Sequence, residues 1–186
     1  MEYVDDQYEF RFQFPADWTL RQLSPPQKAA EAGEVRALVE HSAERIKVMS
    51  IVGFLPKPLI SRERFESNPN RNGPVGGMID ASIERHYQAT SRQLGADQMI
   101  VTEKRILPSQ AGIKFHISTT NLFLRPRPDG VTEFRIAGVH IFPFEKRYMI
   151  ALILFTPVDK NTMKIDETMT RLFNSFHVAG ESPSSK

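Results

Sequence analysis

The sequence predicts a single α+β domain, a three-layer α/β/α sandwich in which helices flank a mostly antiparallel sheet of about six to seven strands. Two observations carry this prediction. Four apolar, alternating segments follow one another between residues 99 and 156 with only short turns between them, which is typical of antiparallel hairpins. The last of these segments is apolar on both faces, so helices must cover the sheet on both sides.

Length and composition bound the class of protein. The 186 residues predict one domain, which we place at residues 1–179, with a small polar tail at 180–186 that we expect to be disordered. The absence of cysteine excludes a disulfide framework, thiolate metal sites and cysteine nucleophiles. The formal net charge is only +2 and the basic residues are scattered, so we expect no nucleic-acid partner.

The first two predicted elements are a strand and a short helix. Aromatic residues alternate with polar ones at Tyr8, Phe10, Phe12 and Phe14. This period of two predicts a strand with an aromatic inner face, which Pro15 ends. At residues 24–27 a capping pattern with a proline at the first helical position predicts a short helix, which Gly33 stops.

A hairpin comes next. Alternation at residues 35–39 and 45–55 predicts two strands, joined by a four-residue connection at 41–44. Glu40 then lies opposite Arg45, a register that places apolar side chains opposite one another on the inner face.

Residues 56–77 interrupt the pattern. Their prolines and glycines exclude a long regular element, and connections of this length are usually functional or mobile, so we place the candidate interaction surface here. Its anchors mix cationic and apolar side chains, as interfaces do. They are Arg62, Arg64, Phe65 and Arg71. An apolar stripe at residues 79–94 follows and predicts a helix that ends at Gly95.

Four strands complete the predicted sheet. They lie at residues 99–107, 113–124, 132–144 and 147–156. Asp129-Gly130 predicts a two-residue turn, which places Thr119 opposite His140 on one face. The next turn, around residues 145–146, places Gly138 opposite Ile153.

No residue pattern predicts catalysis. The five histidines match no metal-binding spacing, and the sequence contains neither a nucleophile elbow nor a phosphate-binding loop. His116 and His140 fall on opposite faces of the sheet and cannot form one site. We therefore expect no catalytic residues, no metal and no cofactor. The register leaves one pocket to consider, between the sheet and a helix, with Thr119 and His140 inside it.

Both ends of the chain resemble the PsbP-like family. The aromatic strand ends in Pro15-Ala-Asp-Trp18, and a hydrophobic strand leads through Thr156-Pro157, where we expect a helix to begin, to Asn174-Ser175-Phe176. The resemblance implies an antiparallel sheet between helices, a fold shared with a Ran-binding nuclear import factor and with bacterial DcrB-type lipoproteins. Members of this family are binding or assembly modules without a catalytic residue set.

The sequence and the resemblance together predict a non-enzymatic binding or assembly module with a protein partner. The alternative is a small-ligand binder or minor hydrolase that uses the pocket near His140. We expect no membrane span, because the longest apolar run, Tyr148–Phe155, is far shorter than the roughly twenty residues required. The acidic first residues contain no signal-peptide pattern. This fits a cytoplasmic protein, and it fits equally an exported protein or lipoprotein whose signal has been removed. The partner and the oligomeric state stay open.

Overall fold

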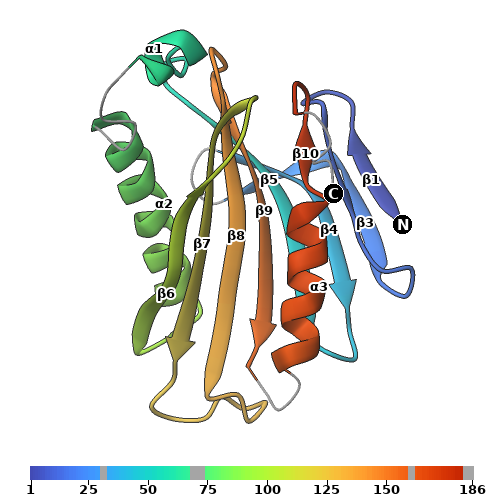
Figure 1. The fold of residues 1–186 in the computed structure, drawn as a ribbon. Coiled ribbons are helices and arrows are strands. Elements are labelled where there is room, and N and C mark those ends of the chain that lie inside the picture. The colour runs from blue at the N-terminus through green and yellow to red at the C-terminus, as the bar shows by residue number, and fades with distance from the viewer. Residues whose placement is uncertain (30–32, 68–73, 159–161, 182–186) are drawn as a thin grey trace.

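The computed structural model describes residues 1–29, 33–67, 74–158 and 162–181. Its central element is a seven-stranded antiparallel sheet with the spatial order β3-β4-β5-β9-β8-β7-β6 (Figure 1). Its strands are β3 (Thr19–Ala29), β4 (Gly33–His41), β5 (Ile46–Phe54), β6 (Gln98–Leu107), β7 (Gly112–Leu122), β8 (Glu133–Pro143) and β9 (Tyr148–Pro157). A smaller sheet has the order β1-β2-β10, with strands β1 (Glu2–Asp5), β2 (Phe10–Gln13) and β10 (His177–Val178).

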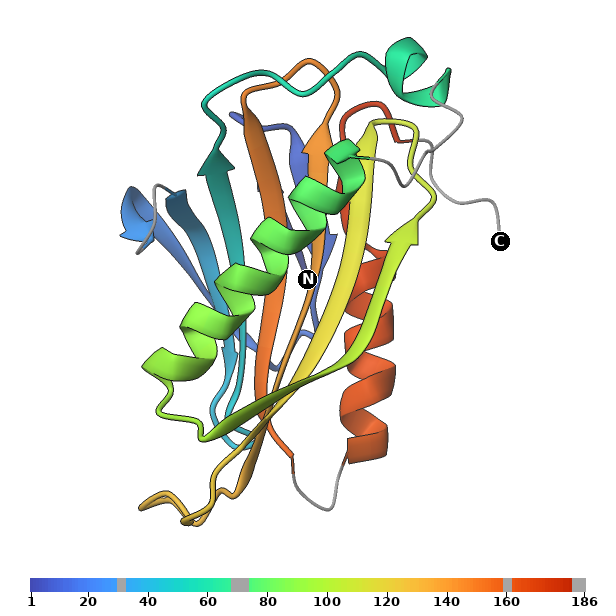
Figure 2. The same cartoon turned by 90° about the vertical axis from the view of Figure 1, so that its left-hand side faces the viewer.

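Helices cover the main sheet on both faces, which confirms the predicted layers. The helices are α1 (Arg62–Glu66), α2 (Pro74–Gln93) and α3 (Thr162–Asn174). Figure 2 shows α2 crossing one face diagonally, whereas α3 and the small sheet lie against the opposite face (Figures 1 and 2). The α+β class and the antiparallel sheet are therefore as predicted.

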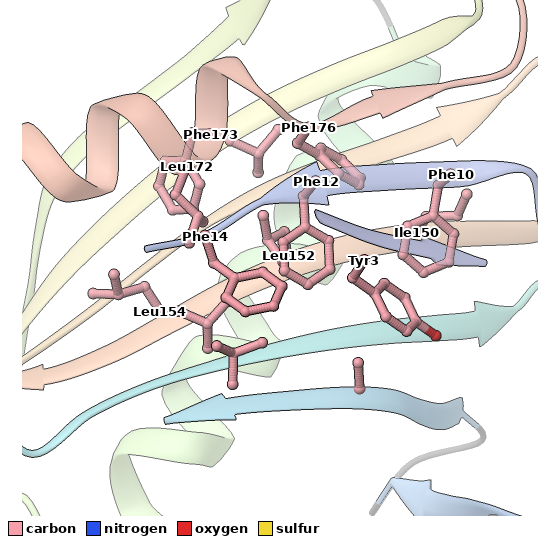
Figure 3. Close-up of a cluster of buried hydrophobic side chains, with 14 of the residues drawn as sticks. Tyr3, Phe10, Phe12, Phe14, Ile150, Leu152, Leu154, Leu172, Phe173 and Phe176 are labelled. Atoms are coloured by element: carbon pink, nitrogen blue, oxygen red, sulfur yellow. The ribbon is translucent and has the colours of Figure 1, made fainter. Parts of the chain in front are cut away.

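The face beneath α3 and the small sheet packs a largely aromatic core. Phe10 and Phe12 of β2 are 1% and 0% exposed. Phe10 meets Phe176 edge-on at 6.2 Å between ring centroids. Figure 3 shows Phe12 beside Leu152 of β9 and Phe10 beside Ile150 of the same strand. The predicted aromatic inner face is confirmed, although its strand belongs to the small sheet.

The face beneath α2 packs a second core. Ile83 and Tyr87 of α2 are buried against apolar side chains of β7 and β8, among them Phe115. The strand β9 contributes to both cores, with Leu152 in the first and Ile153 in the second. Its place in the middle of the sheet confirms that the doubly apolar strand is central.

A buried ion pair ties the small sheet to the main one. Asp5, at the end of β1, is 4% exposed and accepts a hydrogen bond of 2.8 Å from Arg36 Nε on β4. Its other carboxylate oxygen accepts from the backbone N–H groups of Gln7 and Tyr8 at 3.1 and 3.0 Å. These bonds fix the turn between β1 and β2, and with it the position of Tyr8.

The predicted register of β7 and β8 is wrong. Thr119 lies opposite Ile136, and His140 lies opposite Phe115. A tight turn does form at residues 127–130, where Gly130 N donates to Arg127 O at 2.8 Å and Arg127 N donates to Val131 O at 3.0 Å. The pairing then shifts before Phe123, whose N–H donates to Thr132 O at 2.9 Å, so the turn does not set the predicted register. The predicted register of β8 and β9 is confirmed, with Gly138 opposite Ile153.

The hairpin of β4 and β5 is displaced by two residues from the predicted register. Glu40 lies opposite Lys47, not Arg45. The reason lies in the turn: Arg45 adopts a left-handed backbone conformation, with φ of 55°, and is its last residue. The loop therefore consists of residues 42–45.

The short helix predicted from residue 24 is wrong, because β3 continues as a strand from Thr19 to Ala29. The pairing of β3 with β4 shifts between Gln22 and Gln27, so the strand contains an irregularity at Pro25-Pro26. Proline has no N–H to donate and is tolerated on an edge strand or at a bulge. The same prolines that suggest a helix start are accommodated here by the sheet edge.

Two other helix boundaries also differ from prediction. The helix α2 begins at Pro74, so residues 74–77, predicted to be irregular, form its first turn. Pro157 pairs with Phe134 as the last residue of β9, and the described part of α3 runs from Thr162. The predicted helix start at Thr156-Pro157 is therefore wrong.

The structure describes the first two residues of the predicted tail, Gly180 and Glu181. Glu181 is placed, and its side chain is 8% exposed; the remainder of the predicted tail, residues 182–186, lies outside the described residues. No helix among the described residues is long and apolar enough to cross a membrane.

Candidate functional site

His140, the predicted pocket residue, lies in a closed part of the core. It is 1% exposed, and its Nε2 lies 3.2 Å from the hydroxyl of Tyr87 in a buried hydrogen bond. Burial lowers the pKa of His140 to about 3, so the imidazole is neutral near pH 7. Burial also raises the pKa of Tyr87, which remains a phenol.

Thr119 is equally closed off. It is 0% exposed, and its hydroxyl donates to Ile136 O at 3.3 Å. Thr119 and His140 share the sheet face beneath α2 but are not opposite each other. Neither residue lines the two cavities described below.

The predicted interaction surface forms the short helix α1 at one end of the main sheet (Figure 1). Ser61 caps this helix by accepting from Arg64 N at 3.3 Å. Phe65 is half-buried, with its ring centroid 5.8 Å from that of Phe144. Arg62 pairs with Glu66 at 2.7 Å, and Arg64 is exposed. Arg71 lies outside the described residues.

The same end of the sheet holds a half-exposed aromatic cluster that the sequence interpretation missed. Phe54, the last residue of β5, is 49% exposed. The Tyr8 ring lies 6.5 Å from Phe54 and 5.1 Å from Tyr148, which is opposite Phe54 in the sheet. The guanidinium of Arg36 lies 5.2 Å from the centre of the Tyr8 ring. The residues come from three strands, β4, β5 and β9, and from the turn between β1 and β2, so no local sequence motif predicts the cluster.

A cavity of about 640 Å³ lies between the main sheet and α3, and we call it the β6–α3 cavity. Its charged and titratable side chains come from β6, β7 and the C-terminal segment. They are Glu103, Arg105, Lys114, His116, His177 and Glu181. In the register of β6 and β7, Arg105 lies opposite His116 and Leu107 lies opposite Lys114. The first of these pairs is polar on both strands, and the second places Lys114 beside an apolar side chain.

The charged groups of the β6–α3 cavity lie close together in pairs. Lys114 Nζ lies 3.2 and 3.3 Å from the two carboxylate oxygens of Glu181, and these side chains are only 12% and 8% exposed. His116 is 4% exposed and its Nδ1 lies 3.2 Å from Glu103 Oε2. Burial lowers the pKa of His116 and outweighs the attraction of Glu103, so this imidazole is neutral near pH 7.

His116 and His140 lie on opposite faces of the sheet, which confirms that they form no common site. His116 faces α3, where its ring contacts that of Phe173 at 5.6 Å, and His140 faces α2. Among the described residues, no group of three or more His, Asp or Glu side chains is placed to hold a metal ion. A second cavity, of about 610 Å³, lies between the start of the chain and α3, with Phe14 and Arg171 in its wall.

This architecture is the PsbP-like fold, which confirms the predicted resemblance at the level of the fold. The solution structure of cyanobacterial PsbP (CyanoP) from Synechocystis sp. PCC 6803 is similar with a TM-score of 0.58 and 16% identity, covering 96% of this chain and 91% of that chain. The crystal structure of the Ran-binding protein Mog1p from Saccharomyces cerevisiae is similar with a TM-score of 0.55 and 9% identity, covering 96% and 94%.

Comparison of the sequence alone gives no match. No family model matches the chain, and no curated protein matches it. The predicted likeness to DcrB-type lipoproteins stays a prediction. At such low identities, the similarity to the two solved structures shows a common fold.

Proposed function

We propose that the protein is a non-enzymatic binding or assembly module, which contacts a protein partner through the end of the main sheet that carries α1. Phe54 carries this proposal, because a large aromatic side chain at a strand end is 49% exposed beside two further aromatic rings. Covering about 100 Å² of that ring would contribute about 2.5 kcal/mol to binding. Arg64 of α1 adds an exposed guanidinium at the same end.

The residues predicted from the sequence and the aromatic cluster have complementary roles in this proposal. Phe65 is held by Phe144 and positions α1, whereas Phe54 offers its ring to a partner. Aromatic and arginine side chains are the residue types that most often dominate interface energies. One of the structural neighbours is, by its title, a Ran-binding protein, which supports a protein-binding use of this fold.

The alternative, a small-ligand binder or minor hydrolase at His140, is not carried forward. His140 is 1% exposed, and its Nε2 is hydrogen-bonded to the Tyr87 hydroxyl. Neither side chain lines the β6–α3 cavity or the second cavity formed by the described residues, and the Thr119 hydroxyl donates to a backbone carbonyl.

A photo-crosslinking amino acid placed at position 54 tests the proposed surface. We expect an adduct with a specific protein in cells that natively express the chain. Leu124 provides the matched control position, because it is 86% exposed and lies in the β7–β8 connection at the opposite end of the molecule (Figure 1).

The dissociation constant for the captured partner then tests whether Phe54 belongs to the binding surface. Phe54→Ser is expected to weaken binding by about tenfold or more, whereas Leu124→Ser leaves it unchanged. An adduct that forms only at position 124, or an unchanged constant for Phe54→Ser, would show that the surface is placed wrongly.

A further inference from the structure

The β6–α3 cavity has the shape and wall chemistry of a small-molecule site, independent of the surface proposed for a protein partner. Its volume of about 640 Å³ lies within the range of about 300–1,000 Å³ that is usual for such sites. Val139 of the sheet and Phe173 of α3 provide an apolar wall and are 1% and 9% exposed. Charged side chains line it on the sheet side, and Thr170 and Asn174 add uncharged polar groups from α3.

Arg105 presents a free hydrogen-bonding fork to this cavity. Its side chain is 62% exposed, and its Nε lies 3.0 Å from Glu103 Oε1. Within the described part of the chain, its two terminal nitrogens have no partner. A guanidinium with both terminal nitrogens free matches a carboxylate in geometry and charge.

His116 adds a buried polar atom whose hydrogen bond is missing. Its side chain is 4% exposed, and Nδ1 makes no hydrogen bond, although Glu103 lies 3.2 Å away without the required alignment. A buried polar atom without a partner costs free energy, so native proteins usually supply one. Since Arg105 and His116 are cross-strand neighbours, one ligand group can reach both.

The remaining charges of the cavity are already matched. Lys114 and Glu181 neutralise each other, and Glu181 Oε2 also accepts from Val178 N at 3.3 Å. Glu103 lies against both Arg105 and His116, which shows that a carboxylate fits this position. Its own side chain is 41% exposed and can turn toward solvent.

We propose that the β6–α3 cavity binds a small organic carboxylate with an apolar body. The apolar body lies between Val139 and Phe173, and the carboxylate binds the terminal nitrogens of Arg105 and the imidazole of His116. Glu103 occupies the carboxylate position in the free protein and competes with the ligand.

Three probes with the same phenylpropyl body test the ligand class: 3-phenylpropionate, 3-phenylpropionamide and 3-phenylpropylamine. Each is titrated into the full-length ¹⁵N-labelled protein, and amide shifts give both the dissociation constant and the location. We expect the carboxylate to shift signals of β6, β7 and α3 and to bind about tenfold more tightly than the amide.

Two variants test the roles of the charged residues. Arg105→Gln is expected to weaken 3-phenylpropionate binding by about tenfold, and Glu103→Gln to strengthen it by about threefold, because a competing carboxylate is removed. Arg92→Gln, on the exposed C-terminal turn of α2, is the matched control and should leave the constant unchanged. All three positions are solvent-exposed or half-exposed, so the variants should fold.

Several outcomes would overturn the proposal. Tighter binding of the amine than of the carboxylate, together with weaker binding in Glu103→Gln, would make the cavity a cation site. The absence of shifts around the cavity with all three probes would mean that no ligand of this body binds. Loss of the proposed protein partner in the crosslinking experiment has no bearing on these titrations.

Discussion

At the scale of single residues, the pair of Tyr87 and His140 shows how the core accommodates polar groups. Both side chains are almost completely buried, and one hydrogen bond of 3.2 Å joins the Tyr87 hydroxyl to His140 Nε2, while His140 Nδ1 makes none among the described residues. Gly138 makes room for this pair, since a Cβ atom there would lie 2.4 Å from the Tyr87 hydroxyl. The histidine that the sequence singles out is therefore a structural residue.

Removing the Tyr87 hydroxyl should destabilise the protein. Tyr87→Phe leaves His140 buried without its partner, so we expect the free energy of unfolding to fall by about 1–3 kcal/mol. Urea denaturation measures this change. Tyr148→Phe is the control, because its half-buried ring makes no hydrogen bond through the hydroxyl among the described residues, and it should stay within about 0.5 kcal/mol of wild type. Equal effects of the two substitutions would contradict the role given to the pair.

His140 should also make stability depend on pH. Its pKa falls from 6.5 to about 3 on folding, so below about pH 6.5 the unfolded chain binds a proton that the folded chain does not. The free energy of unfolding should therefore decrease as the pH falls through this window, by up to about 1.4 kcal/mol per pH unit from this group. Urea titrations from about pH 7 to about pH 4 would show this slope reduced in Tyr87→Phe/His140→Leu. If the double variant showed the same dependence of the free energy of unfolding on pH as wild type, His140 would not be its source.

At the scale of elements, side-chain alternation was sufficient to predict the last four strands of the main sheet. It was not sufficient to fix how they pair. Side chains repeat every two residues along a strand, so a slip by an even number preserves the inner face. The pairings of Thr119 with His140 and of Glu40 with Arg45 were both displaced by an even number, and the pattern could not detect either error.

Local breaker residues explain the other differences. Pro25-Pro26 predicted a helix start, and the edge of the sheet accepted the same residues in a strand. The glycines that follow Pro74 predicted an irregular segment, yet a helix includes them in its first turn. In each case the tertiary position of the segment decided between two local structures that the residues allow.

The C-terminal segment is held by a buried ion pair, which gives a prediction for an element. Glu181→Ala leaves Lys114 without a carboxylate and Val178 N without an acceptor, so we expect a loss of about 3 kcal/mol. Glu66→Ala is the control, because Glu66 pairs with Arg62 at a site where both side chains are half-exposed, and it should cost less than about 1 kcal/mol. Chemical denaturation measures the free energy of unfolding of both variants. If both lost a similar amount, burial of the Lys114–Glu181 pair would contribute nothing to stability.

At the scale of the whole molecule, both edges of the main sheet oppose the addition of another strand. Pro25 and Pro26 lie in β3, and the register of β6 shifts between Val101 and Glu103, next to charged residues. Prolines, bulges and charges are the devices that keep sheet edges from pairing with other chains.

We therefore expect the protein to be a monomer in solution. Light scattering coupled to size exclusion should give a mass near 21.2 kDa. Pro25→Thr/Pro26→Val restores two backbone donors at an edge and is expected to promote association. A wild-type dimer would show that these edge features do not prevent pairing.

The layers and the fold were within reach of the sequence, whereas the cavities and the small sheet were not. Because β9 is apolar on both faces, both faces of the sheet must be covered, and the residues of this single segment are enough to predict that. The β6–α3 cavity joins Glu103 and Arg105 to Phe173 and Glu181, which are about 70 residues apart in the chain. Only the packing of α3 against the sheet brings these residues together.

The pairing of β2 with β10 has a consequence for biosynthesis. The aromatic strand formed by residues 10–13 finds its last sheet partner and its cover, Phe176, only near the other end of the chain. At translation rates of about 5–20 residues per second, roughly 10–30 s pass between the synthesis of residues 10–13 and that of residues 172–178. During that interval the nascent chain offers an aromatic β-strand to the chaperones that bind at the ribosome.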